Sequence, residues 1–365
     1  MVRDNWIGQA NLVWKAGDGP IRHTLLAGVE AAWQSNDSTR SDARFNGAAS
    51  AIVALASVLT IPTVTFTGLT TNSHSDVRAL SAFAQDQVEL GDHLQLIAGV
   101  RRDDFRIAST NLLNGYAASR SDGAWSPRFG VILKPRPELS IYASYSKSFL
   151  PQSGDQFSVL AANTVVLPPE SFRNLEAGLK WDVTPTLAFT AAAFQLDRAN
   201  TRLNDPVNPG YYVVSGKSRV KGIEASLTGK LAPGWQLALG YAHQTGRLLS
   251  AVASGTTNIA AGQRLDRLPG DQVTAWLRHD FSRRIGAGLG LVHQSSQFAS
   301  ISNDVRLPAF TRLDAALYWQ ATAGLQLQAN IENLTDTRYF ASAQGDNNIA
   351  VGSPINAKLT ARVKF

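Results

Sequence analysis

Apolar and polar residues alternate along most of this chain, in segments of about ten residues. In the last segment, Asn356–Phe365, every second side chain is apolar. Successive side chains of a β-strand point to opposite faces, so this period predicts a strand with one apolar face and one polar face. Counting such segments predicts about fifteen strands. The clearest segments are Ile21–Trp33, Arg78–Val88, Leu94–Phe105, Leu175–Trp181, Leu187–Phe194, Ile223–Leu227, Trp235–Tyr241, Val273–Phe281, Ala287–Gln294, Leu313–Trp319 and Leu325–Ile331.

The connections between these segments are alternately short and long. Turn residues mark the short ones, for example Gly17–Pro20, Gly91–Asp92 and Pro233–Gly234. The long ones are polar and are expected at Ser35–Ser75, Ser109–Gly123, Leu150–Ser171, Asn200–Gly210, Arg247–Gly270, Ser295–Phe310 and Asn333–Ile355. A membrane barrel has short turns on one side and long loops on the other, whereas a soluble sandwich mixes the two lengths. The pattern therefore predicts an all-β fold, an antiparallel transmembrane β-barrel.

The alternation also predicts which side chains face lipid. Toward lipid we expect Leu237, Leu239, Leu313, Leu317, Leu325, Leu327, Leu359, Ala361 and Val363. Toward the lumen we expect Arg312, Asp314, Gln326, Gln328, Lys358 and Arg362. Aromatic belts at the two membrane interfaces are expected to include Trp181, Trp235 and Trp319 beside short turns, and Tyr339 and Phe340 in the last long connection.

Composition agrees with a barrel and excludes several other classes. Hydrophobic residues make up 44% of the chain and the mean hydropathy is -0.10. No run reaches the ~18 apolar residues of a membrane-spanning helix. The most apolar stretch, Ala48–Ile61, is interpreted as a loop or short strand, with a buried helix as the alternative. The net charge of +6 is spread without a basic run, so nucleic acid is not an expected partner.

Metal and disulfide chemistry have little support in the sequence. The chain has no cysteine, which excludes disulfides and thiolate metal sites. Its six histidines stand apart, without the spacing of metal ligands, so no metal site is predicted.

A series of short motifs runs through the chain in a fixed order. The motifs are Ala82–Leu90 with Gly99–Asp103, Ser126–Gly130 with Tyr142–Phe149, Pro169–Glu170 with Leu175–Lys180, Arg219–Glu224, Asn333–Tyr339 and the terminal Phe365. In this order they resemble the TonB-dependent siderophore receptors, the ferrichrome-receptor type in particular. A last strand that ends in Phe is also how bacterial outer-membrane barrels usually finish.

The resemblance implies a receptor that imports a ferric siderophore across the outer membrane of a Gram-negative bacterium, energised through TonB. Its surroundings would be outer-membrane lipid and lipopolysaccharide. The ligand of such receptors is a preformed iron chelate, so no cofactor and no metal ligand from the protein are expected.

One departure from the family concerns length. Family barrels have about twenty-two strands around a plugged lumen, whereas about fifteen are predicted here. The first residues, Met1–Trp6, contain no apolar signal segment. We therefore expect residues 1–365 to be the C-terminal barrel portion of a receptor without its plug. The barrel is expected to be incomplete, with its first and last strands unpaired.

The motif residues are expected to have structural roles. Arg128, Glu176, Gly222 and Glu224 alternate with apolar neighbours, so they should face the lumen. Two further residues, Asn333 and Asp336, follow a strand and precede a loop, where side chains cap free backbone groups.

Candidates for ligand contact come from one aromatic loop. Tyr211, Tyr212 and Arg202 combine aromatic and cationic groups, which suit an anionic or amphipathic iron chelate. Packing within the loop is the alternative role for each of them.

Three other functions stay open at this point. A passive porin-like channel would share the polar lumen and the long loops. An outer-membrane hydrolase would need a grouped nucleophile, base and orienting residue, and no such motif is recognisable, so no catalytic residue is predicted. A receptor of the same family for cobalamin, haem or a sugar would have similar loops.

Overall fold

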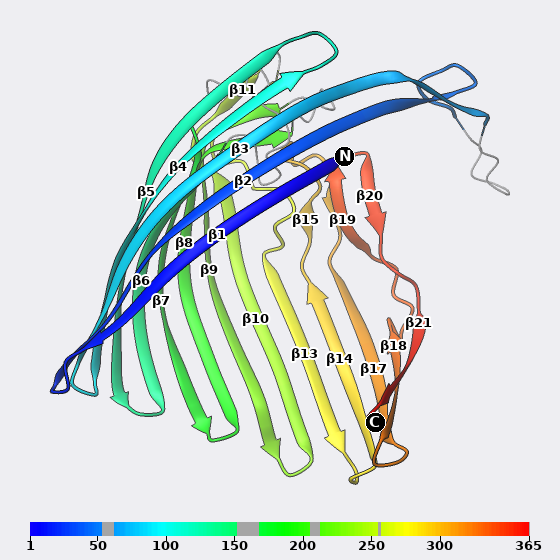
Figure 1. Cartoon of the computed structure of the whole chain (residues 1–365). Coiled ribbons are helices and arrows are strands. Elements are labelled where there is room, and N and C mark those ends of the chain that lie inside the picture. Colours follow the sequence, from blue (N-terminus) through cyan, green and yellow to red (C-terminus); the bar gives the residue numbers. More distant parts are fainter. Residues whose placement is uncertain (53–61, 152–167, 205–211, 255–256, 365) are drawn as a thin grey trace.

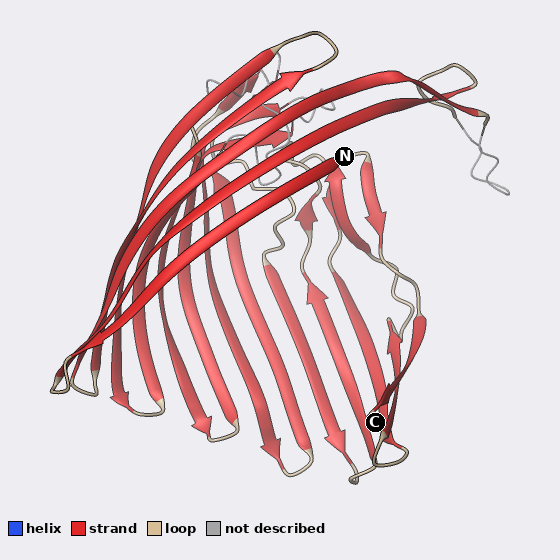
Figure 2. Ribbon diagram, viewed as in Figure 1, coloured by secondary structure: helices blue, strands red, loops and turns tan. Residues whose placement is uncertain are grey.

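The computed structural model describes residues 1–52, 62–151, 168–204, 212–254 and 257–364. In this part of the chain the only regular elements are strands (Figure 2), and no helix long and apolar enough to cross a membrane occurs there. Fifteen strands form one antiparallel sheet in which each strand pairs with the next. They are β1 (Val2–Ala16), β2 (Ile21–Phe45), β3 (Val64–Leu90), β4 (Leu94–Asn111), β5 (Ala117–Arg136), β6 (Leu139–Leu150), β7 (Glu170–Thr184), β8 (Leu187–Asn204), β9 (Tyr212–Ala232), β10 (Trp235–Leu248), β13 (Asp271–Asp280), β14 (Ile285–Gln294), β17 (Phe310–Gln320), β18 (Leu325–Glu332) and β21 (Asn356–Val363).

Six short strands form hairpins within the long connections. They are β11 (Val252–Ser254) with β12 (Thr257–Ile259), β15 (Gln297–Phe298) with β16 (Arg306–Leu307), and β19 (Phe340–Gly345) with β20 (Asn348–Val351). Figure 1 shows them on the side of the long loops, opposite the short turns.

The large sheet curls into a partial barrel with two free edges. In the described residues β1 pairs only with β2, and β21 pairs only with β18 (Figure 1). The predictions of about fifteen strands and of an incomplete barrel with unpaired outer strands are confirmed. An odd number of antiparallel strands leaves the first and last strands parallel, so the two edges could meet only in a parallel seam. Single-chain bacterial barrels use even strand numbers and close with antiparallel pairs.

Several strands are longer than predicted, which corrects the expected loops Ser35–Ser75 and Ser109–Gly123. The pairing of β2 with β3 continues to Phe45 opposite Val64, with register shifts beside Ser41. Similarly, β4 and β5 leave only residues 112–116 between them. Polar side chains occur on both faces of these extensions, so the alternation is lost although the backbone ladder continues. Of the apolar stretch Ala48–Ile61, residues 53–61 lie outside the described residues, and Ala48 forms an isolated bridge with Phe45.

The register assigns each strand residue to one of two faces, because directly paired residues point to the same side. One row of paired residues is apolar: Leu237, Leu277, Leu289, Ala315, Ile331 and Ala357. The adjacent row on the opposite face is Gln236, Arg278, Gly288, Ala316, Asn330 and Lys358. We call these two sides of the sheet the apolar face and the polar face. All nine residues expected toward lipid lie on the apolar face, and all six expected in the lumen lie on the polar face.

Tryptophans border the apolar face at both ends. Trp181, Trp235 and Trp319 lie beside short turns, with 45%, 39% and 51% of their surface exposed. At the other border, Trp33 and Trp125 are also exposed on this face. The belt role expected of Tyr339 is wrong, since its ring is only 8% exposed. Arg312 and Gly352 pack against that ring, and it stacks on Phe310.

Candidate functional site

The polar face brings the motif residues of β5 to β9 together. Glu176 and Gly222 lie in one row of the ladder, both paired with Phe194. Glu224 pairs with Ala192 in the next row, and Arg128 lies on the same face of β5. The register thus places all four side chains on the face that would line a lumen.

A tyrosine and a glutamate form the central contact of this surface. The Tyr142 hydroxyl donates a hydrogen bond of 2.7 Å to Glu176 Oε1. Lys180 Nζ lies 5.8 Å from the centre of the Tyr142 ring, within the range of a cation–π interaction. The phenol is therefore held between an anion and a cation from β7.

Two glycines allow aromatic rings to lie close to the backbone of this surface. A Cβ at Gly222 would be 2.7 Å from the Phe194 ring, and a Cβ at Gly178 would be 2.9 Å from Tyr142 Cζ. Any larger residue would push these rings away from the sheet. A Cβ would also be 2.5 Å from the Ala191 carbonyl oxygen at Gly178 and 2.7 Å from the His243 carbonyl oxygen at Gly222, so the ring and the neighbouring backbone together explain why both positions are glycine.

A concavity of about 600 Å³ opens on the polar face of β6 to β10 and β13. Tyr142, Lys180, Glu224 and Gln272 line it, together with the Thr190 and Ser226 hydroxyls, which lie 2.7 Å apart. These groups both donate and accept hydrogen bonds and carry one charge of each sign. The surface is suited to reversible binding of a polar partner.

Three long connections above β10 to β21 fold against each other. We call the described residues 248–254, 257–270, 295–309 and 333–355 the loop assembly. One apolar cluster consists of Leu248, Leu265, Ile259 and Ile301, and another of Ala299, Val305, Leu307, Ala343 and Ile349.

Side-chain hydrogen bonds join the three loops of the assembly. Asn303 Oδ1 accepts from the Arg264 amide at 3.1 Å, and its Nδ2 donates to the Arg264 carbonyl at 2.9 Å. The Ser300 and Ser302 hydroxyls donate to Asp346 Oδ2 at 2.9 and 3.0 Å. The loops therefore form one packed unit.

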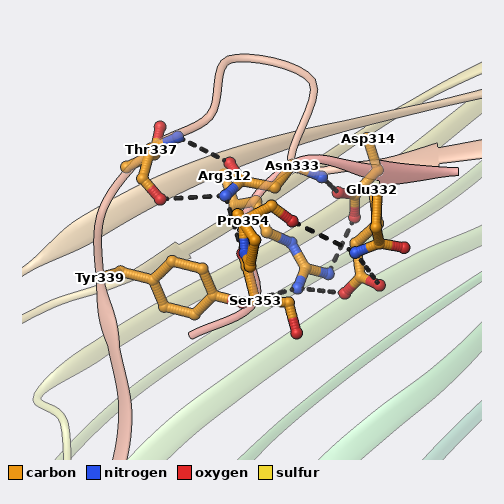
Figure 3. Close-up of polar contacts among 9 residues, drawn as sticks. Arg312, Asp314, Glu332, Asn333, Thr337, Tyr339, Ser353 and Pro354 are labelled. Atoms are coloured by element: carbon orange, nitrogen blue, oxygen red, sulfur yellow. Dashed lines mark hydrogen bonds and ion pairs between the residues drawn. The ribbon is translucent and has the colours of Figure 1, made fainter. Parts of the chain in front are cut away.

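An arginine on the polar face anchors the last loop to the sheet (Figure 3). Arg312 donates to Asp314 at 2.9 Å, to Glu332 at 2.5 Å and to the Tyr339 hydroxyl at 3.1 Å. A guanidinium can make these bonds at once because it carries five donors in a fixed plane. The network links β17, β18 and the start of the last loop.

Asn333, drawn in Figure 3, and Asp336 cap backbone groups at the start of this loop. Asn333 is fully buried, and its side chain accepts from the Thr337 amide at 2.9 Å and donates to the Thr337 and Ser353 carbonyls at 3.0 Å. The Asp336 carboxylate accepts from the Ile355 amide at 2.9 Å. Both residues have positive φ, 56° and 49°, a conformation that asparagine and aspartate adopt more readily than most residues.

The three residues predicted to contact ligand lie within or close to a stretch outside the described residues. Tyr211 is outside the described residues, as is the terminal Phe365. Arg202 and Tyr212 belong to β8 and β9, which pair up to Asn204 opposite Tyr212. The backbone thus brings Arg202 and Tyr212 to the same end of two adjacent strands.

Cross-strand histidine–carboxylate pairs are a feature that the sequence analysis missed. His74 contacts Asp37 at 2.7 Å and Asp76 at 3.1 Å, and the hydrogen bond to Asp37 is the main cause that raises the His74 pKa. His23 pairs with Asp86 at 2.7 Å, and His243 with Asp271 at 2.8 Å. Sequence distance hid these pairs, since up to 63 positions separate the partners. The described residues contain no group of three or more potential ligands that could hold a metal ion.

The fold and its two faces define part of the wall of a membrane β-barrel. The chain belongs to the TonB-dependent receptor-like β-barrel family, whose model matches residues 2–334. This is a family of outer-membrane receptors.

Particular relatives are similar over nearly the entire chain. The metal-pseudopaline receptor CntO of Pseudomonas aeruginosa is 29% identical over 372 aligned positions, which cover 98% of this chain and 51% of the relative. The crystal structure of the siderophore receptor PiuA from Acinetobacter baumannii superposes with a TM-score of 0.84 at 22% identity, covering 98% of this chain and 55% of that one. The ferric-catecholate import receptor Fiu from Escherichia coli in its closed form has a TM-score of 0.79 at 22% identity, covering 100% and 55%. The chain spans about half the length of the curated relatives it matches.

Proposed function

We propose that this chain is the barrel portion of a TonB-dependent receptor that imports a ferric siderophore across a Gram-negative outer membrane. The observation that carries the proposal is the family match over residues 2–334. The curated relatives include a probable TonB-dependent siderophore receptor of Acinetobacter baumannii and a catecholate siderophore receptor of Escherichia coli. Because the chain spans about half of such proteins, the plug and the segment that contacts TonB are expected from the rest of the protein.

The loop assembly and the polar face suit different roles in this function. The loop assembly stands at the side of the long loops and is stiffened by its own apolar clusters, so it suits first contact with a bulky chelate. Below it, the polar face offers the concavity beside Tyr142 and Lys180 to a plug or to a passing ligand. The chelate brings its own iron, so the barrel needs no resident cofactor. Tyr211, Tyr212 and Arg202 stay our candidates for ligand contact.

Uptake of labelled iron by whole cells tests this function. The complete reading frame that contains this chain is expressed in a bacterial strain without its own siderophore receptors, with and without functional TonB. We expect uptake from one siderophore class and only with TonB. Uptake that persists without TonB would support the porin-like alternative, and uptake of cobalamin, haem or a sugar in place of iron would redefine the ligand.

A matched experiment uses residues 1–365 alone in outer-membrane vesicles. Both edge strands would expose unpaired backbone groups to lipid, at several kcal/mol per group. We expect no TonB-dependent transport by this segment. Transport by these residues alone would contradict the assignment as a barrel portion.

A further inference from the structure

Side chains of β13 cover the polar face of the neighbouring strand β14. Three consecutive positions of β14 on this face are glycines: Gly286, Gly288 and Gly290. A Cβ at Gly288 or Gly290 would be 2.6 or 2.7 Å from the Trp276 ring, and one at Gly286 would collide with Asp280 Oδ1. The half-buried indole of Trp276 therefore lies close to the backbone of β14, which has no side chain of its own at these positions.

Arg278 of β13 reaches across β14 to Tyr318 of β17. Its guanidinium carbon lies 4.1 Å from the centre of the Tyr318 ring, within the range of a cation–π interaction. Both residues pair with glycines of β14, so no side chain stands between them. Arg278 Nε also donates to Asp280 Oδ1 at 2.9 Å, which fixes the guanidinium over the ring. Two aromatic rings and a cation thus lie on neighbouring strands of the polar face.

A cavity of about 370 Å³ opens at the short-turn end of this surface. Three arginines line it, Arg278 and the exposed Arg283 and Arg284 of the turn between β13 and β14. The one carboxylate among its lining residues is that of Asp280, which already accepts from Arg278. Arg283 and Arg284 form no ion pair within the described part of the chain. The cavity therefore offers two unpaired cations beside aromatic rings.

Cations also predominate on the strands next to this cavity. Lys358 and Arg362 of β21 lie on the same face, and Arg362 pairs with Gln326, which lines the cavity. The concavity beside Tyr142 differs, because it carries one charge of each sign. Fixed charges of one sign raise the local concentration of an oppositely charged ligand. An anion in the lumen would thus be drawn to the short-turn end of this wall.

We propose that Trp276, Arg278, Arg283, Arg284 and Tyr318 form a transit site for an anionic iron chelate whose iron is held by catecholate rings. The phenolate oxygens of such a chelate accept charge-assisted hydrogen bonds from guanidinium groups, and its rings stack on aromatic side chains. A cavity of this size is within the range that holds small ligands. A neutral chelate without rings would use neither the arginines nor the two aromatic side chains.

The inference rests on the proposed function and adds to it a substrate class and a second place of contact. The earlier candidates Arg202 and Tyr212 lie at the long-loop end of β8 and β9. The transit site lies at the opposite end of the polar face, beside the short turn between β13 and β14 (Figure 1). A chelate that enters past the long loops would therefore meet the transit site last, before its release.

Equilibrium binding to the complete protein, purified in detergent, tests the transit site. The probe is the iron(III) complex of a synthetic tris-catecholate, and the uncharged iron(III) complex of a tris-hydroxamate, which has no aromatic ring, is the comparison. R283Q/R284Q removes the two unpaired cations, and W276L removes one ring. The matched control K134Q/R136Q neutralises two cations at another short turn, the one between β5 and β6.

We expect two classes of tris-catecholate site in the unchanged protein and the loss of one class in R283Q/R284Q. Each lost charge-assisted hydrogen bond should weaken binding at that site about tenfold or more. Loss of ring stacking in W276L should weaken it about threefold to tenfold. The control should bind the chelate with unchanged affinity at both sites.

Thermal unfolding without chelate separates ligand binding from a structural role. R283Q/R284Q should melt at the same temperature as the unchanged protein, because the two guanidinium groups have no ion-pair partner in the described part of the chain. A lower melting temperature would show that the arginines hold an acidic segment of the complete protein, and it would contradict the transit site.

Three binding results would also overturn the inference. They are a single class of site in the unchanged protein, unchanged affinity in R283Q/R284Q, and equally tight binding of the tris-hydroxamate complex at the second site. TonB-dependent iron uptake is measured in parallel. Failure of the proposed function appears as missing uptake by a protein whose chelate binding still depends on the arginines. Failure of this inference appears as intact uptake with chelate binding that is insensitive to them.

Discussion

The long-loop side of the molecule is built in two different ways. Above β10 to β21, the loop assembly is held by buried side chains such as Leu248 and Leu307, which are 1% and 2% exposed. Above β2 and β3, the chain continues as a two-stranded ribbon to Phe45 opposite Val64, and Phe66 is 75% exposed there. Contacts between distant segments stabilise the first region, whereas the second relies on its ladder of backbone hydrogen bonds. Single side chains should therefore matter far more in the loop assembly than in the ribbon.

Truncation of a buried leucine gives the largest expected contrast. L248A removes a fully buried side chain from the cluster with Ile259 and Ile301 and should cost about 2–5 kcal/mol in the unfolding of the loop assembly. F66A in the ribbon should change stability by less than about 0.5 kcal/mol. Hydrogen exchange of the two regions measures both effects. Equal losses of protection would show that the ribbon also depends on side-chain packing.

Loss of the buried cap should have the next largest effect. N333A leaves the Thr337 amide and two carbonyls without their partner in a buried site, at about 1–3 kcal/mol for an unsatisfied group. The control N348A removes one exposed hydrogen bond, to Gln344, and should be nearly neutral. Thermal unfolding compares the two variants. A neutral N333A would mean that the Arg312 network alone anchors the last loop.

Removal of Asp346 tests how two loops depend on each other. D346A deletes the acceptor of the Ser300 and Ser302 hydroxyls, so we expect a cost of about 1–2 kcal/mol. A double-mutant cycle with S302A should give a coupling energy of about 0.5 kcal/mol or more. Additive effects would show that the loops pack without mutual support.

The smallest expected effect is a pH dependence at the base of the ribbon, where His74 and Asp37 pair in the large sheet. Hydrogen bonding to Asp37 raises the His74 pKa above its ordinary value of about 6.5. A raised folded-state pKa contributes stability that is complete below the unfolded pKa and disappears as the pH rises through the folded pKa. Hydrogen exchange in β2 and β3 should therefore be slower at pH 6 than at pH 8, after correction for intrinsic rates. In H74N this difference should vanish, while the loop assembly should show none in either protein.

Much of the sheet could be predicted from the sequence, but only where one face of a strand is apolar and the other is polar. Alternation located the strands near the membrane, for example at Leu325–Ile331 and Leu187–Phe194, because burial in lipid demands one apolar face. Alternation did not predict the extensions of β2 to β5. Both faces of these extensions meet water, so neither face has to be apolar. Alternation also missed the hairpin of β19 with β20, whose pairing depends on packing against a neighbouring loop.

In the candidate site too, some features follow from the local sequence pattern and others depend on which strands pair. The positions of Arg128, Glu176 and Glu224 on the polar face follow from a period of two, which is a property of the local backbone. The hydrogen bond of Tyr142 to Glu176 and the contacts of Arg312 depend on which strands are neighbours. Tyr211, Tyr212 and Arg202 stay predictions.

The sequence by itself determined the two faces of the sheet, because successive residues of any strand point to opposite sides. It also determined the approximate number of strands in the large sheet, through turns and loops placed between apolar segments. Only the tertiary structure decided which side chains meet across the strands. Lys147 opposes Arg173, and Arg219 opposes Arg247, through a register that the turns and the paired backbones set together. A one-residue slip would separate these charges, so no local pattern could reveal them.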